Sequence, residues 1–472
     1  MKLTLNGKIN RTYVQSLCMM FFHGEKFPEN EENPAKFLTV NTYDTEEGIE
    51  CECTLEAFGK KAKANGFAKF IEGEKYERTS KSAVGMAVYN AGVELTGKEI
   101  PWGILTGIRP SKVAYEQICR YGEAEAKVNL KERYFLSENK ADLAIQVAKN
   151  EGEILKLSDN SNCSLYISIP FCPSRCNYCS FISYATPKLF ELVPAYIDKL
   201  TSEIASTLKS IKEQRLKLLT VYIGGGTPTV LNENQLEAVL KAVYDNTDVN
   251  ELLEFTLEGG RPDTITEGKL SIAKRYGVNR ISVNPQTLND DVLKFIGRRH
   301  TVSDFLEAYE RVRKSEIKFV NTDLIAGLEN DSFDSFKATV DRIISLHPDN
   351  ITVHSFSVKK SAQILRDNED IYNKSDDYAI KSVDYAYKTL IANGYEPYYM
   401  YRQKNTVCDL ENVGYAKKGT FGIYNVLMMS DCHTVYGVGA GSTTKIVKNI
   451  DGKLEINRIF SKKYPYEYLQ DE

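Results

Sequence analysis

The sequence has little excess charge, no long apolar run and no secretory leader pattern. Its 472 residues carry a net charge of -4 with a pI of about 6.0, and no polybasic run interrupts them. This balance argues against nucleic acid and anionic lipid as partners. No apolar stretch reaches the roughly 18 residues that a membrane span requires. Residues 1–14, MKLTLNGKINRTYV, lack an apolar signal region, so we expect a cytoplasmic protein.

Cysteine is also scarce, but it is unevenly distributed. Ten cysteines in 472 residues are too few for a disulfide scaffold. Three of them nevertheless fall within IPFCPSRCNYCSF (169–181), where Cys172, Cys176 and Cys179 are spaced C-x3-C-x2-C. In a reducing compartment, a cluster of this kind indicates metal binding more than a disulfide.

Residues 1–150 have the pattern of a mixed α/β domain. The alternation in residues 36–56 predicts two strands around the turn-prone TEEG. Helices are expected near 78–96 and 110–122, and a charged helical connector over 136–160.

From residue 164 onward, short β-rich runs alternate with helical runs. One helix is expected to run from Leu189 to Ile211, with Pro187 in its first turn. Six strand-and-helix units imply a parallel sheet with right-handed crossovers. Since six units are too few for a regular eight-fold barrel, we expect a partial (β/α)6 TIM-like barrel. Strands are expected at 165–169, 218–224, 254–258, 280–284, 319–325 and 350–356, and further helices at 232–244, 266–276, 289–296, 302–315 and 333–346.

The predicted fold class is therefore α/β, with three parts. These are an N-terminal α/β domain (1–150), the partial barrel (160–358) and a smaller C-terminal α/β region (359–472) that covers the barrel mouth. The C-terminal region begins with a helix near 376–393. Its run GVGAGS (437–442) lacks the G-x-G-x-x-G helix entry of a dinucleotide loop, and we interpret it as a turn near the site.

The three clustered cysteines follow the first predicted barrel strand, where loops usually carry the chemistry. Burial as small hydrophobic residues does not explain three thiols within eight residues. Zinc stays open, with His354 or His433 as a possible nitrogen ligand. An iron–sulfur cluster that only carries electrons takes four thiolates. Three thiolates would leave one iron open for a substrate or cofactor, and count, spacing and position favour this interpretation.

These motifs resemble those of the radical S-adenosylmethionine (SAM) superfamily. LYISIPFCPSRCNYCSF and YIGGGTPT (222–229) are similar to the oxygen-independent coproporphyrinogen III oxidase family, and the similarity extends over roughly 160–445. IPWGILTGIRPSK and YRQKNTVCDLENVGYAKKG resemble the clostridial and bacillar branch called coproporphyrinogen dehydrogenase.

The resemblance implies a [4Fe–4S] cluster on Cys172, Cys176 and Cys179, with SAM on the open iron. Reductive cleavage of SAM would then give a 5′-deoxyadenosyl radical. The family's SAM-site positions fall on Tyr166, Gly225, Gly226, Thr227, Glu258, Gln286, Arg298 and Asp323, with Ser357 a weaker match.

The implied reaction is oxidative decarboxylation of two propionates of coproporphyrinogen III to vinyl groups, which gives protoporphyrinogen IX. A flavodoxin- or ferredoxin-like protein would donate electrons. Ser180–Phe181 departs from the family's fourth cysteine, and a haem chaperone and an anaerobic haem-degrading methyltransferase are therefore alternatives.

A tetrapyrrole site needs flat walls and cations for the substrate carboxylates. The run YYMYRQK offers Tyr398, Tyr399, Tyr401, Arg402 and Lys404, although a strand of alternating buried aromatics explains it equally well. His433 is expected at the surface, and under the chaperone alternative it or His354 would be a candidate haem ligand.

Overall fold

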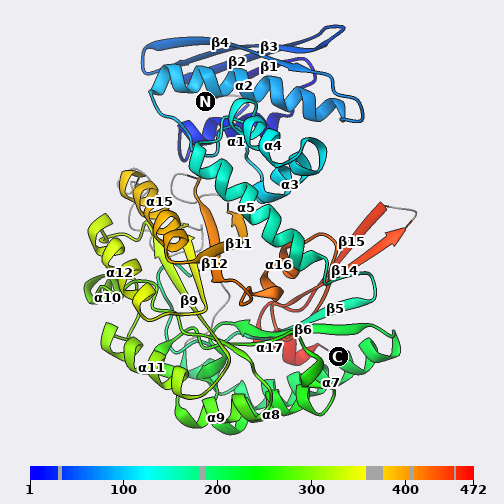
Figure 1. The fold of residues 1–472 in the computed structure, drawn as a ribbon, viewed down its shortest axis with the longest axis vertical. Helices are drawn as coiled ribbons and strands as arrows, with labels where there is room; N and C mark the ends of the chain where they lie inside the picture. The colour runs from blue at the N-terminus through cyan, green and yellow to red at the C-terminus, as the bar shows by residue number, and fades with distance from the viewer. Residues whose placement is uncertain (30–33, 180–185, 358–375, 404–408, 451–452, 472) are drawn as a thin grey trace. The chain divides into compact units, whose positions relative to one another are not determined.

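The computed structural model describes residues 1–29, 34–179, 186–357, 376–403, 409–450 and 453–471. The described chain forms two compact units (Figure 1). The first contains residues 1–148 with the short segments 401–403 and 409–410, and the second contains the remainder. No helix in these described ranges is long and apolar enough to cross a membrane.

A four-stranded sheet organises the first unit, in the order β1-β2-β3-β4. β1 runs parallel to β2, and the other neighbours are antiparallel. The predicted pair of strands around TEEG is confirmed as β2 and β3. β1 and β4 were not predicted. In β4, the apolar positions are mostly alanine and give a weak signal. The strands are β1 (Lys2–Asn6), β2 (Lys36–Asp44), β3 (Gly48–Ala57) and β4 (Lys60–Lys69).

The described residues of this part of the chain also form the helices α1 to α5. The predicted helices near 78–96, 110–122 and 136–160 are confirmed as α2, α3 and α5. α2 ends where Gly97 adopts the left-handed conformation, with φ of 69°. The helices are α1 (Arg11–Phe21), α2 (Tyr76–Thr96), α3 (Pro110–Tyr121), α4 (Glu123–Glu132) and α5 (Glu138–Leu155).

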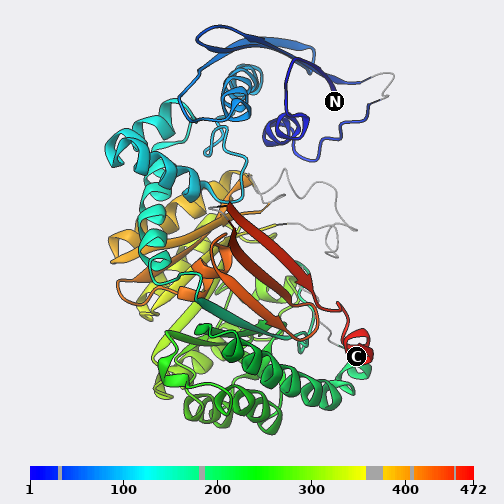
Figure 2. The same cartoon turned by 90° about the vertical axis from the view of Figure 1, so that its right-hand side faces the viewer.

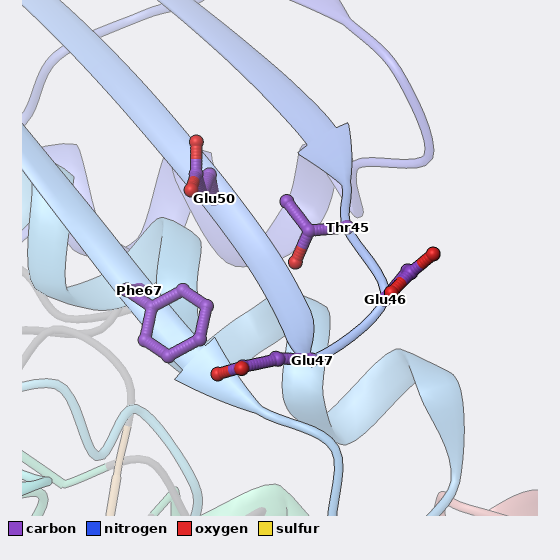
Figure 3. A pocket seen from close by; sticks show the side chains of 5 residues that line it. All are labelled: Thr45, Glu46, Glu47, Glu50 and Phe67. Atoms are coloured by element: carbon purple, nitrogen blue, oxygen red, sulfur yellow. The ribbon is translucent and has the colours of Figure 1, made fainter.

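A depression lies at the turn between β2 and β3 (Figure 3). Thr45, Glu46, Glu47, Glu50 and Phe67 line it. It belongs to the first unit, whereas all eleven predicted cluster and SAM residues belong to the second.

The second unit is built on an eleven-stranded sheet, in the order β11-β12-β10-β9-β8-β7-β6-β5-β13-β14-β15. Its middle six strands are parallel and follow chain order, so the predicted open series of six βα units is confirmed. They are β5 (Asn162–Ile169), β6 (Lys217–Gly225), β7 (Glu254–Glu258), β8 (Arg280–Ser282), β9 (Phe319–Ala326) and β10 (Asn350–Ser355).

Helices follow these strands at the predicted places. The predicted helix over Leu189–Ile211 is interrupted: α6 (Pro187–Phe190) is a single turn, and α7 (Val193–Glu213) starts anew with Pro194 in its first turn. Proline has no backbone N–H to donate, so Pro194 suits a helix start and not an interior. The other helices are α8 (Glu233–Tyr244), α9 (Glu267–Arg275), α10 (Asp290–Phe295), α11 (Val302–Lys314) and α12 (Phe333–Ser345).

Strands from the C-terminal region extend the same sheet at both edges. β12 (Glu411–Lys417) pairs antiparallel with β10, and β13 (Thr434–Val438) pairs parallel with β5. β14 and β15 form a hairpin beyond β13 (Figure 2). The remaining elements are α15 (Asp376–Ala392), β11 (Tyr395–Arg402), α16 (Ile423–Met429), β14 (Thr443–Ile450), β15 (Lys453–Phe460) and α17 (Pro465–Gln470).

The two faces of the six parallel strands differ in chemistry. Alternate residues point to opposite faces of a strand. One set is apolar and buried, including Leu165, Ile167, Val221, Ile223 and Phe255. The opposite set is polar or aromatic along every strand: Ser164, Tyr166, Ser168, Thr220, Tyr222, Glu254, Thr256, Glu258, Arg280, Ser282, Asn321, Asp323, Asn350, Thr352 and His354.

Candidate functional site

Three stacked tyrosines lie on the polar face. Tyr166 on β5 and Tyr222 on β6 are direct neighbours in the sheet register. Tyr424 from α16 stacks on Tyr222 with ring centroids 4.5 Å apart, and its ring lies 6.3 Å from that of Tyr166. The predicted SAM-site residue Tyr166 is therefore one member of a flat aromatic surface to which the C-terminal region contributes.

Two carboxylates lie beside this aromatic surface: Glu258 at the end of β7 and Asp323 in β9. Glu258 accepts a hydrogen bond from the Tyr222 hydroxyl at 3.2 Å, and the Gly225 N–H also donates to it. Asp323 accepts from the Asn284 side-chain amide at 2.7 Å, and His354 Nε2 is 3.9 Å from the same carboxylate. Burial, followed by the charge of Asp323, raises the pKa of Glu258 to about 7.

The cysteine loop follows β5 and is held against the segment after α10. The Asn177 backbone N–H donates to the Ile296 carbonyl at 3.0 Å, and its side chain donates to the Phe295 carbonyl at 2.8 Å. Cys172 and Cys176 are buried, while Cys179 is half-buried. The loop is thus fixed by backbone contacts next to its thiols.

The glycine loop after β6 packs directly on the start of the cysteine loop. The Gly226 N–H donates to the Ile169 carbonyl at 2.7 Å, and a Cβ at Gly226 would lie 2.4 Å from the Phe171 carbonyl oxygen. Thr227 is buried, and its Oγ1 is 3.4 Å from Cys172 Sγ. The absence of a side chain at Gly226 therefore lets the glycine loop pack closely against the backbone of the cysteine loop.

Gln286 and Arg298 also lie at this edge of the sheet. Gln286 has a φ of 70° and forms a bridge to Leu324 of β9, and its buried Oε1 has no hydrogen-bond partner among the described residues. Arg298 Nη1 donates to the Asn284 carbonyl at 2.5 Å, and its Nε lies 3.4 Å from the Tyr178 hydroxyl in the cysteine loop. Ser357 follows β10 and is half-buried.

A buried ion pair lies lower on the same face, toward the start of the strands. Arg280 Nε is 3.3 Å from Glu254 Oε2, and both side chains are 3% exposed. The Ile423 N–H donates to the same glutamate oxygen at 2.7 Å, and Arg280 donates to the Thr420 carbonyl at 2.9 Å. This pair therefore fixes the segment that carries Tyr424 to the sheet.

Comparison with known proteins identifies the family. Residues 166–343 match the model of the radical SAM superfamily. Over 450 residues, the chain is 31% identical to the oxygen-independent coproporphyrinogen-III oxidase-like protein HemZ of Bacillus subtilis, covering 93% of this chain and 89% of that protein. The chain belongs to the family of oxygen-independent coproporphyrinogen-III oxidase-like proteins within the radical SAM superfamily.

Two further matches come from the same family group. The heme chaperone HemW of Bacillus subtilis is 34% identical over 197 residues, which are 42% of this chain and 51% of that protein. The solved structure of coproporphyrinogen III oxidase HemN from Escherichia coli has a TM-score of 0.50 at 20% identity, covering 68% of this chain and 71% of that one. At 20% identity, the similarity to the HemN structure shows a shared fold.

Family membership brings a [4Fe–4S] cluster and SAM as cofactors, and the residues present fit both. The three cysteines offer the soft ligands that iron–sulfur clusters require. SAM carries an amino group and ribose hydroxyls, which are hydrogen-bond donors. Glu258, Asp323 and Gln286 Oε1, which has no partner in the part of the chain that the structure describes, are acceptors at the same sheet edge.

The zinc alternative finds no support in the described residues. Within these ranges, no three His, Cys, Asp or Glu side chains converge on a single-ion position. A cubane differs from a single ion in that each thiolate binds its own iron, so its ligands surround a volume and do not meet at a point. His433, one proposed zinc ligand, precedes β13 and lies at the starting edge of β5, whereas the cysteines follow the end of β5.

The prediction that His433 lies at the surface is wrong. Its side chain is fully buried, with Nδ1 2.6 Å from the Ser158 hydroxyl and Nε2 2.8 Å from the Ser164 hydroxyl. Burial, followed by the charge of Lys445, lowers the pKa of His433 to about 4. With both ring nitrogens engaged inside the protein, His433 is not positioned as a surface haem ligand.

Within the run YYMYRQK, residues 398–402 belong to strand β11, and the aromatic side chains there are buried or half-buried. Tyr398 is buried, stacks on Phe421 at 5.1 Å, and accepts a hydrogen bond from Asn350 at 2.6 Å. Arg402 is buried in the first unit, where it donates to the Leu105 and Asp409 carbonyls. Tyr399 is buried and Tyr401 half-buried, whereas Lys404 lies outside the described residues.

Several residues of the site escaped sequence analysis. Tyr222 is the first residue of the quoted motif YIGGGTPT, and Asn284 lies two residues before Gln286, so proximity to known motifs could have indicated both. Arg261 follows β7 and was recognisable as a cation at a strand end. Tyr424 had no local signal, since only the fold brings α16 to β5 and β6.

Proposed function

We propose that this protein is an oxygen-independent coproporphyrinogen III dehydrogenase of the cytoplasm, which converts two propionates to vinyl groups. The similarity to a coproporphyrinogen-III oxidase-like protein over 93% of the chain carries this proposal. The stacked surface of Tyr166, Tyr222 and Tyr424 supports it, because a tetrapyrrole needs a flat wall to pack against.

In this proposal Cys172, Cys176 and Cys179 hold the cluster. When bound, the reduced cluster and SAM would supply the radical chemistry needed to remove a propionate β-hydrogen, with loss of CO2 and one electron from the substrate. Glu258, Asp323 and Gln286 would accept hydrogen bonds from SAM. Arg298 and the loop from Gly225 to Thr227 would complete its site. Tyr166 and its stacked partners exclude water from the reacting groups. Residues 359–472 cover the site, and a flavodoxin- or ferredoxin-like protein supplies electrons.

The test is an anaerobic assay with reduced protein, SAM and coproporphyrinogen III. We expect about four irons per chain, formation of 5′-deoxyadenosine, and loss of two CO2 to give protoporphyrinogen IX by mass spectrometry. Cys172→Ala should abolish all three. Cys119→Ala, which removes an exposed cysteine from α3 in the first unit, is the matched control and should behave as wild type.

Haem delivery is the second candidate, because 197 residues of the chain are 34% identical to the heme chaperone HemW of Bacillus subtilis. Stoichiometric haem binding without decarboxylation in the same assay would favour it and contradict the dehydrogenase. Haem consumption with methyl transfer would instead favour anaerobic haem degradation.

A further inference from the structure

A buried arginine outside the predicted site lies against the cysteine loop. Arg261 follows β7 and is 3% exposed. Its Nη1 is 3.8 Å from Cys176 Sγ and donates to the Ser174 hydroxyl at 2.9 Å. Its Nε forms an ion pair with Asp263 at 3.2 Å.

The remaining nitrogen of this guanidinium has no partner. Arg261 Nη2 is buried and forms no hydrogen bond with any described residue. A buried donor of a charged group that lacks an acceptor lowers stability, because it has lost its hydrogen bonds to water and gained none in the protein. Such a donor therefore indicates an acceptor that binds at this place.

The surroundings of Arg261 favour an anion. Arg298, whose Nε lies 3.4 Å from the Tyr178 hydroxyl of the cysteine loop, is also buried. His300 is buried too, and neither of its ring nitrogens has a partner among the described residues. Burial, with the charges of Arg298 and Arg261, lowers the pKa of His300 to about 3, so it is neutral. Two fixed positive charges thus face a loop whose three thiolates, once they bind iron, carry negative charge.

We propose that Arg261 donates hydrogen bonds to the cluster at Cys176 and raises its reduction potential. Hydrogen bonds to the sulfurs and nearby charge are among the factors that set iron–sulfur potentials. A positive charge stabilises the reduced, more negative cluster over the oxidised one. Arg261 is therefore a positioning and tuning residue that helps a physiological donor reduce the cluster. This inference rests on the proposed cluster site, but not on the proposed tetrapyrrole substrate.

The test compares three variants of the full chain after anaerobic reconstitution. Arg261→Met removes the charge and all donors, and Arg261→Lys keeps the charge but loses the planar fork. Arg175→Gln is the matched control, because Arg175 precedes Cys176 in the same loop but is exposed, and water and salt screen its charge. Iron and sulfide content, and the midpoint potential from redox titration followed by electron paramagnetic resonance, are measured for each.

We expect Arg261→Met to lower the reduced-to-oxidised ratio at a fixed potential at least tenfold, or about 59 mV for a one-electron couple. Arg261→Lys should fall between this variant and wild type, and Arg175→Gln should match wild type. Equal potentials in Arg261→Met and Arg175→Gln would overturn the inference. If Arg261→Met binds no iron, the midpoint potential of Arg261→Lys is the test instead. A potential equal to that of the wild type would then overturn the inference. A wild type without iron would instead overturn the proposed cluster site.

Discussion

The hydroxyl of Tyr222 donates a hydrogen bond of 3.2 Å to Glu258 Oε1 on the neighbouring strand. This bond joins the aromatic surface to the carboxylate that the sequence predicted for SAM. Burial is the larger cause of the raised Glu258 pKa. The negative charge of nearby Asp323 raises this pKa further. The predicted acceptor is therefore a group that titrates near neutral pH.

Glu258→Gln should alter how stability depends on pH. Folding raises the Glu258 pKa from 4.5 to about 7. Between these two pH values, the folded protein keeps a proton on Glu258 that the unfolded chain releases. The associated stability is complete below pH 4.5 and is lost as the pH rises through 7. Relative to wild type, the variant should gain up to about 3 kcal/mol in free energy of unfolding between pH 4.5 and 8. Urea denaturation of SAM-free protein measures this.

The control for this variant is Glu213→Gln, at an exposed position at the end of α7. Its pH profile should follow that of the wild type. A Glu258→Gln profile that also parallels the wild type from pH 4.5 to 8 would contradict the assignment.

His433→Asn should reveal a dependence of opposite sign. Folding lowers the His433 pKa from 6.5 to about 4, so the associated stability is complete above pH 6.5 and is lost as the pH falls through 4. The variant should lose part of the acid sensitivity of the wild type below pH 6.5, as measured by thermal unfolding at a series of pH values. His347→Asn, at an exposed position, is the control. Similar effects of the two substitutions would be inconsistent with a buried neutral histidine.

Gly226→Ala should damage the cofactor site. Its Cβ would lie 2.4 Å from the Phe171 carbonyl oxygen and 2.9 Å from that of Ile169, so the glycine loop and the cysteine loop must separate. Overpacking of this kind typically costs about 1–3 kcal/mol. We expect at least a tenfold loss of SAM affinity by equilibrium dialysis of reconstituted protein. Gly107→Ala, where an added Cβ meets nothing within 4 Å, should bind as wild type. Unchanged affinity in Gly226→Ala would show that the two loops can move apart freely.

Arg280→Met should be strongly destabilising, because it leaves Glu254 charged and buried. Removing one partner of a buried pair typically costs about 3–5 kcal/mol. The double variant Glu254→Leu/Arg280→Met should cost less than Arg280→Met alone, and a double-mutant cycle in urea measures the coupling. The exposed pair Lys241–Asp245, with an N–O distance of 2.6 Å, is the control and should show no measurable loss. Equal coupling in both pairs would contradict a special role for burial.

The regular helices and strands were predictable because each shows its buried face as a repeating pattern of apolar residues within its own short segment. The strands from β5 to β10 and their helices have regular apolar patterns, and the cysteine and glycine loops follow directly from strand ends. The break before α7 was predictable in principle from Pro194, whose effect on a helix depends on its position. His433 and Tyr398 could not be assigned from local pattern, since their partners Ser164 and Asn350 are far away in the chain. Tyr424 joins the site only through tertiary structure.

The pairing of β13 with β5 has a consequence for how this protein is made. β5 ends at Ile169, but its neighbour on one side is β13, which ends at Val438. Contacts of such long sequence separation form late, and chains are synthesised from the N-terminus. The strand that leads into the cysteine loop therefore has an open edge on the ribosome until the residues of β13, Thr434–Val438, have emerged. We expect stable insertion of an oxygen-sensitive cluster to follow, and not accompany, translation.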